Sequence, residues 1–174
     1  DRRDSGVPGR GDEGSGGAHR VAQERHAGDL PPRKQPGNPR PGVRRELAEA
    51  TTAFRALVRL AAEAGVVLAY HNHSGDYVGA PVWDALQMIE GQTPTATGLY
   101  FDVRHATVEG GLGGWRVAVQ MASPHLRMLA IKDFYWEKGA NGRWRVVDCP
   151  VGDGMVDWKA FATELRRAKF SGPM

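Results

Sequence analysis

Three short apolar runs of strand length alternate with segments of helical periodicity in the second part of the chain. The runs are VVLAY at 66–70, TGLYFDV at 97–103 and LRMLAI at 126–131. Short, almost continuously apolar runs are typical of strands that are buried on both faces of a parallel sheet. Because parallel strands are joined by crossovers that are usually helical, this alternation predicts an α/β fold built from βα units.

The segments around these runs carry the spacing and the end signals of helices. Apolar residues recur every three or four positions over 44–64, and Gly65 follows where a C-terminal cap glycine is expected. Pro81 suits the first position of a second helix, which should run to about residue 90. Further on, the sequence predicts a helix over 114–122, a Gly/Asn-containing excursion over 138–143, a helix over 157–169, and the approach to another strand over 170–173.

The first 42 residues differ from the rest in composition. They contain nine Gly and six Pro, many Arg and almost no large apolar residues. No window there has a helical or strand period, so a disordered tail is expected. Three interpretations are open: a basic arm for an anionic partner, a plain disordered tail, and non-native sequence. The composition favours the last, because a GC-rich gene translated out of frame yields Gly/Arg/Pro-rich sequence of this kind. The expected organisation is a tail over 1–42 and one domain over 43–174.

Charge and hydropathy narrow the range of partners. Residues 1–45 carry a net charge of +4, whereas residues 46–174 carry −1, so the basic character belongs to the tail. The domain therefore does not favour nucleic acid as a partner. No run approaches the roughly 20 apolar residues of a membrane helix, and no signal peptide is evident. The single cysteine, Cys149, cannot form an internal disulfide, which fits the cytoplasm.

Polar and titratable side chains follow each of the three apolar runs. They are His71, Asn72 and His73 after the first run, Asp102 and His105 after the second, and Lys132 and Asp133 after the third. Active sites of parallel α/β proteins lie at the carboxyl ends of the strands. The sequence therefore predicts that these residues form one site.

The histidines and the aspartate at these strand ends suit metal binding or proton transfer. His71 and His73 point to the same face if the strand continues, so they can bind a divalent metal or exchange protons with a substrate. Fixing the loop by hydrogen bonds is the structural alternative. A buried carboxylate such as Asp102 is costly unless it is paired or bound to a cation. A salt bridge from Asp102 to Arg104 or Lys132 is the structural alternative there.

Other residues have a functional and a structural interpretation as well. Lys132 could bind a substrate hydroxyl, a phosphate or a developing enolate oxygen, or pair with Asp133 or Asp102. Glu109 could orient a histidine. Trp136 is the tryptophan best placed to face a ligand. The glycines of the 151–158 loop suit a turn before a helix capped by Asp157 better than a phosphate cradle.

Four segments, in order and spacing, resemble sugar-phosphate isomerase/epimerase proteins of the xylose-isomerase-like barrel superfamily. They are HNHSGDYVG, FDVRHATVEGG, IKDFYW and VGDGMVDW. The resemblance covers about residues 44–174 and implies an incomplete (β/α)8 TIM barrel of about three βα units plus a leading helix. A complete barrel needs roughly 250 residues. An open three-stranded sheet leaves edges and apolar faces uncovered, so self-association as a homo-oligomer, or instability, is expected.

The resemblance implies proton transfer next to the carbonyl of a small sugar, sugar phosphate or polyol ketone. The alternatives are an inosose-dehydratase-like lyase and a non-catalytic sugar-binding or degenerate barrel fragment. Cleavage of DNA at abasic sites, which related members perform, is disfavoured by the net charge of −1 over residues 46–174.

The superfamily's usual site is a divalent metal held by Glu, Asp, His and Glu at four successive strand ends. Asp102 matches the aspartate and His71 stands in place of the first glutamate. Ala130 stands where the histidine is expected, and the fourth ligand would lie beyond Met174. Mn²⁺, Mg²⁺ or Zn²⁺ is thus expected at an incomplete site with Asp102 and His71 as ligands.

The resemblance also implies roles for the remaining residues. His105 and Glu109 match the histidine and glutamate that follow the aspartate in ketose epimerases. His71, His105 and Lys132 are expected to be catalytic. The residues expected to contact the substrate are Asn72, His73, Glu109, Asp133 and Trp136.

Overall fold

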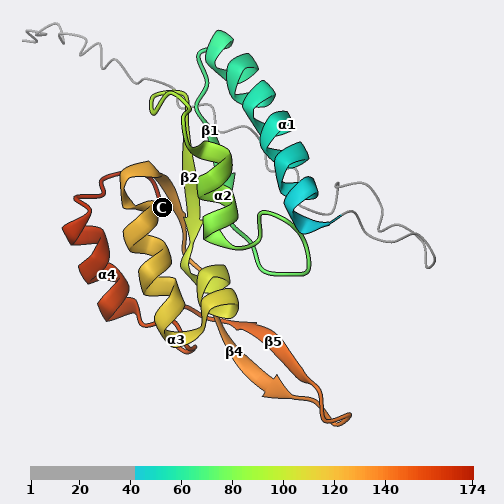
Figure 1. Cartoon of the computed structure of the whole chain (residues 1–174). Helices are drawn as coiled ribbons and strands as arrows, with labels where there is room; N and C mark the ends of the chain where they lie inside the picture. The colour runs from blue at the N-terminus through green and yellow to red at the C-terminus, as the bar shows by residue number, and fades with distance from the viewer. Residues whose placement is uncertain (1–41) are drawn as a thin grey trace, which may run out of the picture.

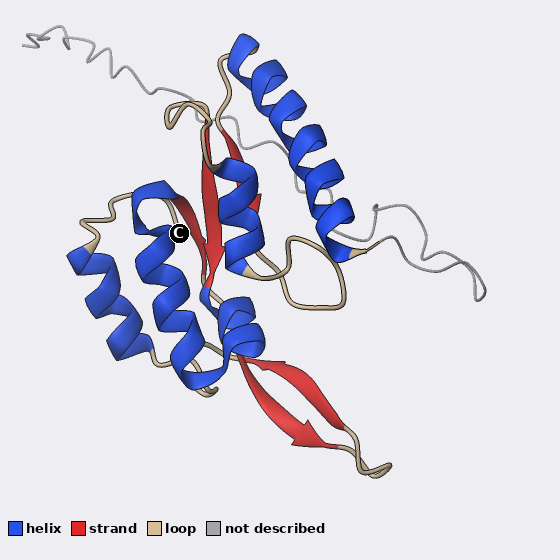
Figure 2. Cartoon of the chain, in the orientation of Figure 1, coloured by secondary structure: helices blue, strands red, loops and turns tan. Residues whose placement is uncertain are grey.

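The computed structural model describes residues 42–174 of the chain, so the predicted tail, apart from Gly42, lies outside the described residues. The elements are α1 (Val43–Glu63), β1 (Leu68–His71), α2 (Val82–Ile89), β2 (Thr97–Asp102), α3 (Val103–Ala122), the 3-10 turn η2 (Ser123–His125), β3 (Leu126–Ala130), β4 (Asp133–Lys138), β5 (Trp144–Cys149) and α4 (Trp158–Arg167). Figure 1 shows their arrangement and Figure 2 shows helices and strands by colour.

The strands form two separate sheets. β1, β2 and β3 are parallel and adjacent in that order, and β4 and β5 form an antiparallel hairpin that projects from the body (Figure 1). Strand–helix alternation with parallel neighbours is the repeating unit of the TIM barrel. The predicted fold, a partial barrel of βα units with a leading helix, is confirmed.

The helices bury one face of the parallel sheet. Leu99 and Phe101 of β2 are completely buried, and the Phe101 ring lies 6.1 Å from that of Phe161 in α4. Phe54 of α1 packs edge-on against Tyr70 of β1 at 5.6 Å. Side chains alternate along a strand, so the residues next to these in sequence point to the opposite face. Asp102, at the end of β2, is among them, which places it away from the apolar core.

Two elements differ from the sequence expectation. Helix α3 begins at Val103, directly after β2, and not near residue 114. A kink at Gly111, with φ 61° and ψ −163°, divides it into two segments, and the sequence expectation covered only the second. The 138–143 excursion is the tight turn of the β4–β5 hairpin, where Gly142 has a φ of 74°. A left-handed residue of this kind is what such a turn requires.

The end of the chain lies beside β3. The Leu129 N–H donates to the Pro173 carbonyl at 3.1 Å, so residues 170–173 approach the sheet as a neighbouring strand would. In the described part of the chain, no helix has the length and apolar content that a membrane crossing requires.

Candidate functional site

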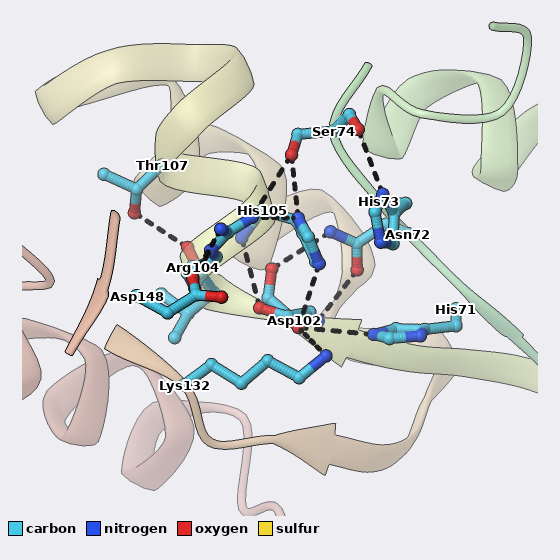
Figure 3. Close-up of polar contacts among 11 residues, drawn as sticks. His71, Asn72, His73, Ser74, Asp102, Arg104, His105, Thr107, Lys132 and Asp148 are labelled. Atoms are coloured by element: carbon cyan, nitrogen blue, oxygen red, sulfur yellow. Dashed lines mark hydrogen bonds and ion pairs between the residues drawn. The ribbon is translucent and has the colours of Figure 1, made fainter. Parts of the chain in front are cut away.

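The polar side chains at the strand ends converge on the carboxylate of Asp102 (Figure 3). Asp102 is completely buried at the end of β2. Its Oδ2 atom lies 3.3 Å from His71 Nε2 at the end of β1 and 3.1 Å from Lys132 Nζ just after β3. His105 Nε2, in the first turn of α3, lies 3.6 Å from the same oxygen. Residues from the ends of three adjacent strands thus meet at one oxygen atom.

Asn72 holds the backbone of Asp102 in place. Its side chain is completely buried, with Oδ1 accepting from the Asp102 N–H at 2.8 Å and Nδ2 donating to the Asp102 carbonyl at 3.0 Å. The amide continues the hydrogen-bond pattern between β1 and β2 one step after β1 ends. Asn72, which was expected to contact the substrate, therefore supports the backbone of Asp102 in the structure.

A second set of hydrogen bonds holds the imidazole of His105. Ser74 Oγ lies 2.8 Å from His105 Nδ1, and Arg104 Nη1 donates to the same nitrogen at 2.8 Å. Because a guanidinium group only donates, Nδ1 must accept, and the neutral ring carries its proton on Nε2, which faces Asp102. The His105 N–H also donates to Asp102 Oδ1 at 3.1 Å, which caps the N-terminus of α3.

Burial and neighbouring charges shift the pKa of both residues. Burial disfavours the imidazolium form of His105 and, together with nearby positive charges, outweighs the attraction of Asp102, which lowers the pKa to about 3. Burial alone would raise the pKa of Asp102, but the hydrogen bond from His71, the attraction and N–H of His105, and the Lys132 charge hold it at about 2. At neutral pH the cluster therefore contains an ionised Asp102 and a neutral His105.

The two histidines that were predicted at the end of the first strand both lie in this cluster. His71 stacks on Tyr100 of β2 with ring centroids 4.4 Å apart, and its side chain is 22% exposed. His73 packs on His105 with ring centroids 3.7 Å apart, and its Nδ1 lies 3.0 Å from the Ser74 carbonyl oxygen. His71 contacts the Asp102 carboxylate itself, whereas His73 reaches it through His105.

Arg104 connects the cluster to the hairpin. Its Nη2 lies 2.5 Å from Asp148 Oδ1 on β5. Of the two salt-bridge partners that the sequence suggests for Asp102, the structure selects Lys132 and pairs Arg104 with Asp148. Sequence reasoning does not find Asp148, because the hairpin itself was not predicted. Ser74 was missed as well, and its only signal is its position directly after the His-Asn-His segment.

Asp133 lies in a different environment from Lys132, its neighbour in sequence. It is 1% exposed, and its carboxylate accepts the N–H groups of Phe134, Gly152, Gly154 and Val156 and the indole N–H of Trp158. Burial raises the pKa of Asp133, but these hydrogen bonds lower it below its usual value. Asp133, which was expected to contact the substrate, therefore holds the loop before α4 in the structure.

The glycine-rich loop has the structural role that the sequence favoured. The Asp157 carboxylate accepts from the Ala160 N–H at 2.9 Å, so the predicted cap of the last helix is confirmed. A Cβ atom on Gly154 would collide with Asp133 and with the Phe134 carbonyl. The N–H groups that could cradle a phosphate bind the internal carboxylate of Asp133 instead.

Glu109 and Trp136 lie farther from Asp102. Glu109 is exposed on α3, and its Oε1 accepts from the Gly75 N–H at 3.0 Å, which fixes the loop that carries His73. Trp136 is 40% exposed on β4, and its ring packs edge-on against Phe134 at 6.3 Å. The structure brings neither side chain into the group drawn around Asp102 in Figure 3.

The donors around Asp102 do not make a divalent metal site by themselves. Asp102 and His71, the two expected ligands, are together, but as a hydrogen-bonded pair. Ala130, which is paired with Asp102 across β2 and β3, has no donor atom in its side chain. Within residues 42–174, no three His, Cys, Asp or Glu side chains are arranged so that they could hold a metal ion.

The fold and the position of the polar cluster together indicate a class of protein. Parallel βα units with a polar cluster at the carboxyl ends of the strands are characteristic of α/β proteins, β/α barrels among them. A family model described as xylose isomerase-like TIM barrel matches residues 16–174. The chain belongs to this family. The match begins well before Arg44, so it includes part of the segment interpreted as a tail, whose non-native origin stays a prediction.

Solved structures share the fold at low sequence identity. D-allulose 3-epimerase from Methylomonas sp., in complex with D-allulose, superposes with a TM-score of 0.59 and 20% identity over 78% of this chain. The probable 3-DHS dehydratase from Bacillus anthracis gives 0.57 and 17% over 75%. A xylose isomerase-like TIM barrel protein from Mycobacterium smegmatis, in complex with magnesium, gives 0.55 and 18% over 73%.

The chain spans only part of each of these structures. It covers 43%, 50% and 42% of their respective lengths. At these identities the likeness shows the fold alone. No curated protein is significantly similar to the chain in sequence.

Proposed function

We propose that this chain is a sugar isomerase/epimerase-like protein whose site transfers a proton next to the carbonyl of a small sugar or polyol ketone. The observation that carries the proposal is that a histidine and a lysine contact the same buried carboxylate oxygen. His71 Nε2 and Lys132 Nζ lie 3.3 Å and 3.1 Å from Asp102 Oδ2. A base and a cation held side by side are what enolisation of a carbonyl compound needs.

His71 is the residue we assign as the base. The ionised carboxylate of Asp102 can only accept, so a His71 ring that acts as a base carries its proton on Nε2 and its lone pair on Nδ1. Nδ1 would take the proton from the carbon next to the carbonyl, and the electron pair of that C–H bond would form the enediolate. For an isomerisation, the imidazolium would then give the proton to the former carbonyl carbon, while the hydroxyl proton of the neighbouring carbon passes to the former carbonyl oxygen. Asp102 would orient the ring and stabilise its charged form.

His105, which the sequence also offers as a catalytic residue, is better suited to a positioning role. It is 4% exposed, and a pKa of about 3 means that it does not take up a proton near neutral pH. Its Nδ1 already accepts from Arg104. We therefore assign proton transfer to His71 and the support of the Asp102 carboxylate to His105.

Lys132 is the residue we assign to the oxygen of the developing enediolate. Its side chain is 47% exposed, and its Nζ lies 3.1 Å from Asp102 Oδ2. An ammonium group has three donors, which leaves donors for a substrate oxygen. A donor aimed at charge that develops during the reaction is worth more than one that binds the ground state.

Exchange of a carbon-bound proton with solvent tests the proposal without knowledge of the true product. The full chain is incubated in D2O with a panel of ketoses that includes D-allulose and D-fructose, and NMR follows the loss of the proton next to the carbonyl. We expect enzyme-dependent deuterium incorporation into at least one member. His71→Asn should slow it by about 10²–10⁴-fold, the usual contribution of a general base.

A matched histidine variant provides the control. His125 lies in η2 at the opposite end of β3, so His125→Asn should exchange at the wild-type rate. Equal exchange rates for the His71 variant and the wild type would refute the assignment of the base. Absence of exchange with every ketose, combined with measurable sugar binding, would favour a non-catalytic sugar-binding protein.

A dehydratase is the second candidate, because the same proton abstraction can be followed by loss of a hydroxide ion. The His-x-His segment at the end of β1 supports it, since this segment also occurs in the inosose-dehydratase branch that the sequence resembles. The same NMR experiment separates the two outcomes. A lyase would produce a new alkene signal and release water, whereas an epimerase or isomerase would return a sugar of unchanged formula.

A further inference from the structure

We propose that Lys132 supplies the positive charge beside Asp102 in place of a divalent metal ion, so that residues 42–174 hold Asp102 in an ion pair and not as a metal ligand. The inference rests on the proposed function only in taking the Asp102 cluster as the reacting site. It follows from three features of that cluster: the contacts of the carboxylate, the lack of further ligands around it, and the balance of charge.

Both oxygens of Asp102 have donors from the chain. Oδ1 accepts from the His105 N–H at 3.1 Å, and Oδ2 is shared by His71 Nε2 and Lys132 Nζ. A buried carboxylate needs a counter-charge, and the ammonium group at 3.1 Å provides one. An ion bound to Oδ2 would have to displace Lys132 from this position.

The neighbouring strand offers no ligand to an incoming ion. Ala130 pairs with Asp102 across the sheet and ends with a methyl group. Divalent ions in catalytic sites are usually bound by at least three protein ligands or by several oxygens. Residues 42–174 provide no group of three suitable side chains.

The charge balance also disfavours an added dication. Lys132 neutralises Asp102, and a second fixed cation, Arg104, lies 2.8 Å from His105 Nδ1 with Asp148 as its counter-ion. The cluster is thus already neutral with two positive groups in it. A further double positive charge would be repelled by both. A single ammonium group suits a neutral sugar that becomes an enediolate during the reaction.

Thermal unfolding and Mn²⁺ titration of the full chain test the inference. Wild type and the variants Lys132→Met, Lys132→Arg and Asp102→Asn are compared after EDTA treatment and with added MnCl2. We expect the wild-type Tm to be the same in both conditions, and no stoichiometric Mn²⁺ binding by calorimetry. Lys132→Met should lower Tm, because the carboxylate loses its counter-ion. Lys132→Arg should restore it.

The double variant identifies the partner of Lys132. In the Asp102→Asn background, Lys132→Met should lower Tm much less than in the wild type, because a neutral amide needs no counter-charge. Equal losses in both backgrounds would overturn the inference. So would tight Mn²⁺ binding by the wild type that Asp102→Asn abolishes. If Lys132→Met does not fold, the wild-type titration alone decides.

These measurements need no substrate, so they separate the two proposals. Deuterium exchange that EDTA abolishes would overturn the ion-pair assignment and leave the proposed function intact. The opposite result is also possible: no exchange, no Mn²⁺ binding, and a Tm loss from Lys132→Met that depends on Asp102. That result would refute the proposed function but support the role of Lys132.

Discussion

At the scale of single residues, His105 makes the stability of the domain depend on pH. Its pKa is about 3 when folded, against 6.5 for the ordinary side chain. Between these values the unfolded chain binds a proton that the folded chain does not. The free energy of unfolding therefore falls as the pH falls, by up to about 1.4 kcal/mol per pH unit. Asp102 adds a loss only at lower pH, below 3.8 and through about 2.

Replacing His105 with Gln should flatten this dependence, because the substituted side chain takes up no proton in either state. The measurement is the urea midpoint of wild type and His105→Gln between about pH 7 and about pH 5. The control His125→Gln should keep the slope that His105 causes. Identical slopes for wild type and His105→Gln would show that His105 is not held neutral in the folded protein.

Asn72 is a second residue whose effect follows from its contacts. Asn72→Ala leaves the N–H and the carbonyl of Asp102 without their partners in a buried position. Each unpaired buried group costs roughly 1–3 kcal/mol, so we expect a clear loss of unfolding free energy. Urea unfolding measures it, with Asn141→Ala in the exposed hairpin turn as the matched control. A loss no larger than that of the control would contradict the role assigned to Asn72.

At the scale of elements, the apolar runs and the helix periods predicted most of the fold because burial determines both. β2 and α4 have strong signals, since Leu99 and Phe161 belong to the core. The β4–β5 hairpin was missed because large apolar residues such as Trp136 and Trp144 are exposed on it, while Phe134 at its base is buried in the core. This mixture leaves no regular alternation that would mark its strands in the sequence. The meeting of polar side chains at Asp102 could be predicted from the sequence, because Asp102 lies at a strand end. The partners of Asn72 and most partners of Asp133 could not be predicted in this way, because they are backbone groups that only the fold brings together.

Asp133 and its loop give the prediction that belongs to this scale. Asp133→Asn replaces one acceptor oxygen with an NH2 group that faces backbone N–H donors. Hydrogen bonds to charged groups contribute roughly 1.5–3 kcal/mol, so we expect a loss of at least about 2 kcal/mol. Urea unfolding followed by tryptophan fluorescence is the measurement. Asp153→Asn, an exposed residue of the same loop, should be neutral. Equal stability of the two variants would argue against the role of Asp133.

At the scale of the whole molecule, the parallel sheet has one face covered by helices and another that carries the site. Leu99 and Phe101 point into the core, whereas Tyr100 and Met128 are half-buried and lie outside it. Among the described strands, β1 is paired with β2 alone, so its other edge is open. Partly exposed apolar faces and open edges favour association between copies, since both gain burial or hydrogen bonds from a second chain.

We therefore expect the chain to self-associate. Light scattering after size-exclusion chromatography should give a mass above 18.9 kDa that rises with protein concentration. Met128→Lys places a charge on the site-bearing face of β3 and should shift the mass toward the monomer. Met121→Lys makes the same change on α3, where Met121 is 50% exposed, and should not. A wild-type chain that stays monomeric at every concentration would mean that the sheet is sufficiently covered by the chain itself, and equal shifts for both variants would place the contact elsewhere.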